Sequence, residues 1–163
     1  MSKVYLDVTK DFTDEFNKLI KSFKNDHVLV GIPEEEGERK EKEPGIIGNA
    51  ALLAINNFGS PLNNIPPRPV MSIGIKNAQE EIAQQFALAV KEFTVEAIDK
   101  YYERAGIIAS NSIKKVINNQ EGIKPPSEAT LKARKYKKFH GTKALIVTGQ
   151  MRNAITYVVK KGA

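Results

Sequence analysis

The sequence contains no cysteine and only two histidines among its 163 residues. The absence of cysteine excludes disulfides, thiolate metal sites and cysteine nucleophiles, and it fits a reducing compartment. No segment approaches the ~20 consecutive apolar residues that span a bilayer, and MSKVYLDVTKDF at the N-terminus lacks the apolar stretch of a signal peptide. We therefore expect a protein made in the cytoplasm that has no membrane partner.

The groups that usually carry catalysis are also scarce. His27 stands at the start of a predicted strand and His140 in a basic segment, and neither has further ligands at zinc spacing. The sequence has no G-x-S-x-G and no G-x-G-x-x-G motif. Residues 141–143 (GTK) imitate the end of a Walker loop, but Tyr136 occupies the position of its first glycine. We predict that the chain is not an enzyme and has no catalytic residue, metal ligand or cofactor.

Length and composition predict one domain, residues 1–163. Hydrophobic residues at 41% and charged residues at 27% are close to globular averages, and a chain of this size can bury an ordinary core. Two segments are expected to be solvated. Residues 34–43 (EEEGERKEKE) contain no apolar side chain and are predicted to form a mobile charged loop, because their interleaved cations argue against a metal site. Residues 120–143 are predicted to be basic and partly flexible.

The net charge of +6 is unevenly distributed along the chain. Residues 1–100 hold 12 Lys and Arg against 16 Asp and Glu, a net −4, whereas residues 101–163 hold 13 against 3, a net +10. Such asymmetry suits nucleic-acid binding, and it equally suits head-to-tail contact between identical subunits. Charge alone does not distinguish these two hypotheses.

Hydrophobic periodicity predicts mainly helices. The expected helices cover residues 11–24, with Phe12, Phe16, Leu19, Ile20 and Phe23 on one face; residues 46–58, capped by Gly59; residues 77 to about 102, the longest; residues 107–117, with a kink or break at Gly106; and a helix that begins at Pro126 and Ser127. Residues 70–75 suit either a strand or the start of the long helix.

Short apolar runs predict the strands. These runs are residues 3–8, a buried strand at 28–32, and two further pieces at 144–147 and 155–159. Four prolines exclude a helix or a central strand at 60–69 and predict a stiff, extended path. The expected fold class is α+β, with a small antiparallel sheet packed against one long helix and two or three shorter helices, and with an extended flexible loop or hairpin.

A basic segment is the strongest positive feature of the composition. Residues 132–143 (KARKYKKFHGTK) interleave aromatic rings with a proposed basic contact patch that comprises Lys132, Arg134, Lys135, Lys137, Lys138 and Lys143. Such a patch can bind phosphate backbones while its rings stack on exposed bases. It can equally form the basic rim of a protein interface, which we favour because no nucleic-acid-binding fold signature accompanies it.

Three segments, in order, carry a family resemblance. Residues 50–69 (AALLAINNFGSPLNNIPPRP) resemble the alanine-rich helix, F-G and I-P-x-R-P pattern of tailed-phage virion morphogenesis and tail-completion proteins. This family includes Mu-like morphogenesis proteins and minor tail components of lambda-like phages. Residues 125–135 (PPSEATLKARK) and 143–159 (KALIVTGQMRNAITYVV) are similar to its P-L-S-x-x-T-x-x-x-K and L-x-x-T-G-x-L-x-x-S-I-x-Y-x-V patterns. Asn56, Asn57, Met151 and Ala154 depart from the family's usual residues.

The resemblance implies a structural protein that oligomerises, as a ring, to complete the tail or to join head and tail. Its implied partners are further copies of itself, head-closure or connector proteins, and tail-tube or tail-terminator proteins, with passing contact to DNA. Its implied location is the neck or tail of the virion, after assembly in the cytoplasm of the host bacterium. A nucleic-acid-binding module that uses residues 132–143 is the alternative.

The residues expected at the assembly interface lie in two of these segments. They are Phe58, Gly59, Pro66, Pro67, Arg68, Pro69, Thr148, Gly149 and Arg152. The prolines are predicted to present Arg68 on a rigid track, so that little entropy remains to be lost on docking. Residues 148–152 are predicted to form a sharp turn into the last strand, whose edge could pair with a neighbour.

Overall fold

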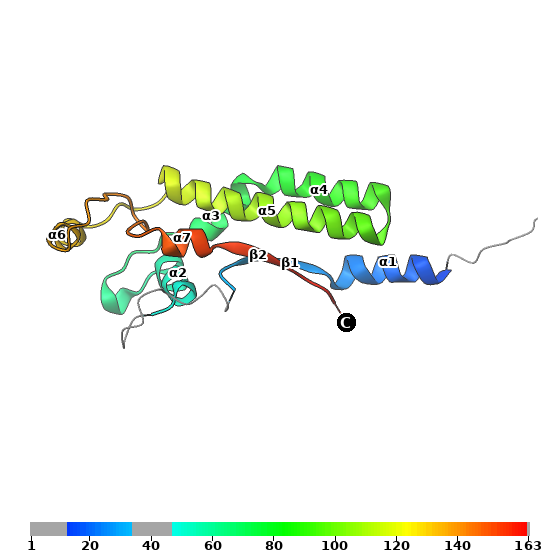
Figure 1. Cartoon of the computed structure of the whole chain (residues 1–163), viewed down its shortest axis with the longest axis horizontal. Helices are drawn as coiled ribbons and strands as arrows, with labels where there is room; N and C mark the ends of the chain where they lie inside the picture. Colours follow the sequence, from blue (N-terminus) through cyan, green and yellow to red (C-terminus); the bar gives the residue numbers. More distant parts are fainter. Residues whose placement is uncertain (1–12, 34–46, 163) are drawn as a thin grey trace, which may run out of the picture.

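A computed structural model of the chain describes residues 13–33 and 47–162 (Figure 1). Within these ranges the elements are α1 (Thr13–Asn25), β1 (His27–Gly31), α2 (Asn49–Phe58), the 3-10 turn η2 (Pro61–Asn63), α3 (Val70–Asn77), α4 (Gln79–Glu92), α5 (Val95–Asn119), α6 (Glu128–Tyr136), α7 (Gln150–Ala154) and β2 (Thr156–Lys160). A small antiparallel sheet beside helices confirms the α+β class, although the described helices outnumber the expected ones. The predicted strand at 3–8 and the charged segment 34–43 lie outside the described residues.

Helix α5 organises the fold. It contacts α4 and α3 on one side and both strands on the other, with further contacts to α1 and α7 (Figure 1). Ile98, Ile113 and Ile117 on α5 are fully buried. The main core cluster joins α5 to α2, α3 and α7 through Leu53, Val70, Ile113, Val116, Ile117, Met151 and Ile155.

The long helices divide at a different place from the one predicted. Helix α4 ends at Glu92, Phe93 adopts a left-handed conformation with φ 48°, and the Thr94 hydroxyl caps α5 by accepting a hydrogen bond from the Ala97 amide at 3.1 Å. The centroid of the Phe93 ring lies 6.2 Å from that of the Phe23 ring, so the turn between α4 and α5 packs against α1. The single helix predicted over 77–102 is therefore wrong. Of the alternatives left open at Gly106, one helix or two, the structure has one, because α5 continues through this residue.

Gly106 lies inside α5, at the point where β2 packs closely against the helix. A Cβ atom at this position would overlap the ring of Tyr157. The glycine thus permits close packing of sheet and helix, a role that glycine can also have within a helical pattern.

The sheet is a two-stranded antiparallel ribbon among the described residues. Leu29 pairs with Val158, and Val30 with Tyr157. Val28 and Val159 pack into the core beside α5, whereas Leu29 and Val158 are exposed. The prediction of strands near 28–32 and 155–159 is confirmed in position, but β1 is half-exposed where a buried strand was expected.

Residues 144–147 form no strand, which corrects the prediction made from their apolar sequence. The Gln120 side chain accepts a hydrogen bond from the Ala144 amide at 2.6 Å and donates one to the Ala144 carbonyl at 3.1 Å. These bonds fix the segment to the end of α5. Residues 70–75, for which two structures were open, belong to helix α3.

Candidate interaction surface at one end of the molecule

Large parts of the three segments that carry the family resemblance lie near one end of the molecule, whereas the last residues of the third segment form β2, which runs from there toward α1 (Figure 1). Helix α2 contacts α7, and both lie near the end that carries α6 (Figure 1). A groove of about 790 Å³ runs between α2, the 60–69 loop and residues 124–130, and its lining includes Asn56, Ile65, Pro66, Arg68, Thr130 and Arg134. A second hollow of about 290 Å³ shares Leu52, Asn56, Arg134 and Leu145 with this groove and adds Thr148 and Gly149. The fold therefore joins distant sequence segments into one hollowed surface.

Arg68 is part of the scaffold of this surface, which corrects the prediction that prolines present it to a partner. It is only 8% exposed, and its guanidinium donates to the carbonyls of Lys124 at 2.8 Å and Pro125 at 3.3 Å. Its amide donates to the Asn56 carbonyl at 2.8 Å. Burial and the positive charge of Arg134 both lower the pKa of Arg68, so two guanidinium groups make the groove electropositive. Arg68 thus connects α2 to the segment that leads into α6.

Replacing Arg68 by alanine is expected to loosen residues 124–143 while leaving α5 intact. The variant would lose two hydrogen bonds from a charged donor, and a hydrogen bond to a charged group contributes roughly 1.5–3 kcal/mol. Relative to the unmodified chain, amide hydrogen exchange should become faster in residues 124–143 and should stay unchanged in α5. Lys76→Ala, at an exposed position of α3, is the control and should leave exchange unchanged. Unchanged exchange in the Arg68 variant would contradict the proposed connection.

The loop after α2 is closed, and two exposed apolar side chains lie at its start, Phe58 at the end of α2 and Leu62 in η2. Gly59 has φ 81°, and a Cβ atom there would lie 2.9 Å from the Ile65 carbonyl oxygen and the Pro67 nitrogen. Ser60 and Ile65 form a β-bridge with two backbone hydrogen bonds of 2.9 and 3.0 Å. The predicted extended path is therefore wrong for residues 60–65, which turn through η2. We call Phe58 and Leu62, which are 78% and 97% exposed, the apolar knob.

The remaining predicted interface residues divide between scaffold and surface. Gly149, with φ 80°, begins α7, and Arg152 donates to the Asn118 side chain at 2.8 Å, which ties α7 to the end of α5. Pro66 is half-buried, whereas Pro67, Pro69 and Thr148 are exposed. Gly59, Arg68, Gly149 and Arg152 thus shape the surface, while Phe58, Pro67, Pro69 and Thr148 are available for contact. Leu62 was not predicted, since nothing in its sequence context distinguishes it from a core leucine.

The basic segment folds into a projection that we call the basic finger, residues 127–143. The Ser127 hydroxyl caps α6 by accepting from the Thr130 amide at 3.2 Å, and Lys138 turns the chain with φ 61°. Arg134 donates to the carbonyls of Gly141 at 2.9 Å and Lys143 at 2.8 Å. Lys143 donates to the Asn118 carbonyl of α5 at 2.7 Å. Arg134 and Lys143 therefore hold the finger together. Arg134 is half-buried, whereas Lys132, Lys135, Lys137, Lys138 and Lys143 are exposed, and Lys143 alone among these five is engaged with α5.

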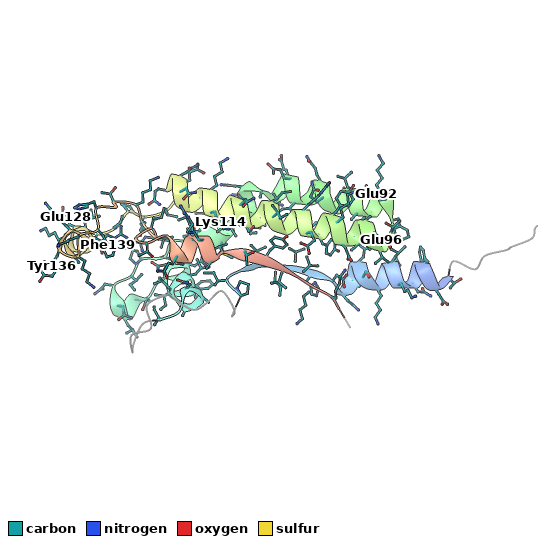
Figure 2. All side chains as sticks on the ribbon, in the orientation of Figure 1. Glu92, Glu96, Lys114, Glu128, Tyr136 and Phe139 are labelled. Carbon is teal, nitrogen blue, oxygen red and sulfur yellow. The ribbon has the colours of Figure 1, made fainter. Side chains whose placement is uncertain are left out.

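The opposite end of the molecule carries a titratable cluster that links α4 to α5. The Tyr101 hydroxyl donates to the Glu92 carboxylate, and the Lys100 ammonium lies 3.3 Å from the same group. The hydrogen bond from Tyr101, followed by the interaction with Lys100, lowers the pKa of Glu92, and the same contacts raise the pKa of Lys100. These contacts link the end of α4 to the first turns of α5. Figure 2 places Glu92 and Glu96 far from Tyr136 of the finger.

His27 and His140 are both exposed and lie in separate parts of the fold. Among residues 13–33 and 47–162, no three His, Asp or Glu side chains gather as a metal site would require. No helix in these ranges is long and apolar enough to cross a membrane. Comparisons of this chain with models of protein families, with curated proteins and with solved structures find no match.

Proposed function

We propose that this chain is a non-enzymatic structural protein of a tailed bacteriophage, which oligomerises as a ring to complete the tail or to join it to the head. The phage context comes from the sequence resemblance, and parts of its segments, α2, the 60–69 loop, α6 and α7, lie near one end of the fold (Figure 1). On this proposal the partners are further copies of the chain, head-closure or connector proteins, and tail-tube or tail-terminator proteins. The protein would be assembled in the cytoplasm of the host and would reside in the neck or tail of the virion.

The observation that carries the assembly proposal is the exposure of the apolar knob. Phe58 and Leu62 are 78% and 97% exposed, although each belongs to an ordered element. A large apolar side chain fixed on a closed loop loses little conformational freedom on docking, and buried aromatic anchors contribute strongly to interfaces. The knob therefore suits insertion into an apolar surface of a neighbouring subunit.

A knob that contacts a different surface of the next copy makes a heterologous interface. Repeating such an interface generates a ring when the rotation closes, and a filament when it does not. The exposed Pro67 and Pro69 beside the knob lie on the same loop and would extend the contact. The ring form follows from the family resemblance.

Replacing both knob residues by serine is expected to weaken assembly strongly. Burial of a Phe or Leu side chain contributes about 1.5–3 kcal/mol, so the double variant should raise the concentration needed for assembly roughly 100-fold or more. Multi-angle light scattering across a concentration series measures this shift. Circular dichroism should match the unmodified chain, because the knob makes no contribution to the described core.

The matched control is Leu88→Ser with Val90→Ser on α4, where the side chains are 37% and 57% exposed. This pair removes a similar apolar character from a helix far from the knob and should assemble as the unmodified chain does. An unmodified chain that stays monomeric, even with head or tail proteins added, would count against the assembly function. Assembly that survives in the knob variant would show that other surfaces form the contact.

A further inference from the structure

The basic finger stands at the extreme end of the molecule. Figure 1 shows α6 there, apart from the α4–α5 helix pair, and Figure 2 shows Tyr136 at the outer edge of this end. The hydrogen bonds of Arg134 and Lys143 fix the shape of the finger and its attachment to α5. Its surface is therefore presented on an ordered frame and needs little ordering when a ligand binds.

The finger concentrates positive charge that the fold itself leaves unpaired. Residues 127–143 contain six Lys and Arg against Glu128 alone, a net charge of +5. Lys132, Lys135, Lys137 and Lys138 are exposed, and none forms a salt bridge with a carboxylate of the described residues. Such a concentration of cations attracts a polyanion.

An aromatic ring lies among these cations. Lys135 and Tyr136 lie three and four residues after Lys132, which places both of them next to Lys132 on the surface of α6. Tyr136 is 90% exposed, so its ring contributes almost nothing to the fold. Lysines that contact phosphates beside an exposed ring that stacks on bases are the arrangement by which proteins bind single-stranded nucleic acid.

We propose that the basic finger binds single-stranded nucleic acid, with Lys132, Lys135, Lys137 and Lys138 on the phosphates and Tyr136 stacked on a base. This site goes beyond the assembly function and does not depend on it. An acidic protein surface would satisfy the lysines equally well but leaves the exposure of Tyr136 without a role. The electropositive groove that contains Arg68 and Arg134 adjoins the base of the finger and would extend the path of the strand.

The test is fluorescence anisotropy of a labelled 20-nucleotide oligothymidine titrated with the full chain at 50 to 200 mM salt. Four phosphate contacts predict that the logarithm of the association constant falls with the logarithm of salt concentration at a slope near −3. Lys135→Glu, Lys137→Glu and Lys138→Glu together should weaken binding by about 100-fold or more at the lowest salt, since three contacts become repulsive. The control is Lys18→Glu, Lys21→Glu and Lys24→Glu on exposed positions of α1, which changes net charge equally and should retain most of the binding.

The role of the ring is tested separately. Tyr136→Ala should weaken binding of the oligothymidine about tenfold and leave binding of a duplex nearly unchanged, while Tyr136→Phe should bind normally. Equal losses in the finger and α1 variants would overturn the proposal, because binding would then follow net charge alone. Competition by polyglutamate as strong as that by the oligonucleotide would assign the finger to acidic proteins. Light scattering of the same variants separates this result from assembly, since the finger variants should still oligomerise.

Discussion

Replacing Ile113 by alanine is expected to lower the free energy of unfolding by about 2–5 kcal/mol, the range observed when a buried isoleucine is truncated. Ile113 is fully buried on α5 and belongs to the main core cluster. Ile113 also lies against Gly74 of α3. A Cβ atom added to Gly74 would come within 2.6 Å of the Ile113 Cγ1 atom. Because the backbone of α3 packs directly against Ile113, the cavity left by the shorter alanine side chain could close only if α3 moved. Urea denaturation followed by circular dichroism measures the loss.

Ile107 provides the matched control for this substitution. It lies on the same helix but is 45% exposed, so Ile107→Ala should cost less than about 1 kcal/mol. If the two variants lost equal stability, Ile113 would not occupy the centre of the core. The assignment of α5 as the organising helix would then be wrong.

Replacing Gly106 by alanine is expected to destabilise the protein by about 1–3 kcal/mol, the usual range for overpacking. Helix propensity alone predicts the opposite effect, because alanine inside a helix is favoured over glycine by roughly 0.5–1 kcal/mol. A loss of stability would therefore indicate a steric cause. The loss should arise from the Tyr157 ring, which the new Cβ atom would overlap. Thermal unfolding of the variant measures the effect.

A second substitution tests that cause. In a Tyr157→Ala background the same Gly106→Ala change should become neutral or stabilising, because the overlapping ring is absent and helix propensity remains. The pKa of Tyr157 reports separately on the position of its ring. Tyr157 donates a 2.6 Å hydrogen bond to Glu103, which raises the pKa of Tyr157, so a displaced ring should ionise at lower pH in the Gly106→Ala protein. Destabilisation that is unchanged in the Tyr157→Ala background would contradict the packing explanation.

The sequence predicted most helices because their apolar spacing is local information. The period of Phe16, Leu19 and Phe23 places α1, and Ser127 identifies the start of α6. The break at Phe93 was missed because a left-handed phenylalanine is stabilised by tertiary packing against Phe23, which no local pattern records. Residues 144–147 were wrongly assigned to a strand because they too are fixed by a tertiary contact. Their hydrogen bonds are made with Gln120, which lies far from them in the sequence.

The candidate surface was predicted in its segments but only partly in its side chains. The sequence identified the segment around Phe58 and the lysines of the finger, and both groups are exposed. It could not predict that Arg68 is buried, because the accepting carbonyls of Lys124 and Pro125 lie far along the chain. Leu62 was missed because exposure of a leucine depends on how the closed loop is oriented, and composition does not fix that orientation.

We propose above that this chain works by fitting its apolar knob against neighbouring subunits. Sedimentation velocity of the purified chain over a wide concentration range tests this claim most directly, with negative-stain images of the heaviest fraction. We predict that the mass rises with concentration to a plateau, which marks a closed ring, and that Phe58→Ser with Leu62→Ser abolishes the rise. A constant monomer mass at every concentration, with or without candidate neck and tail proteins, would contradict it.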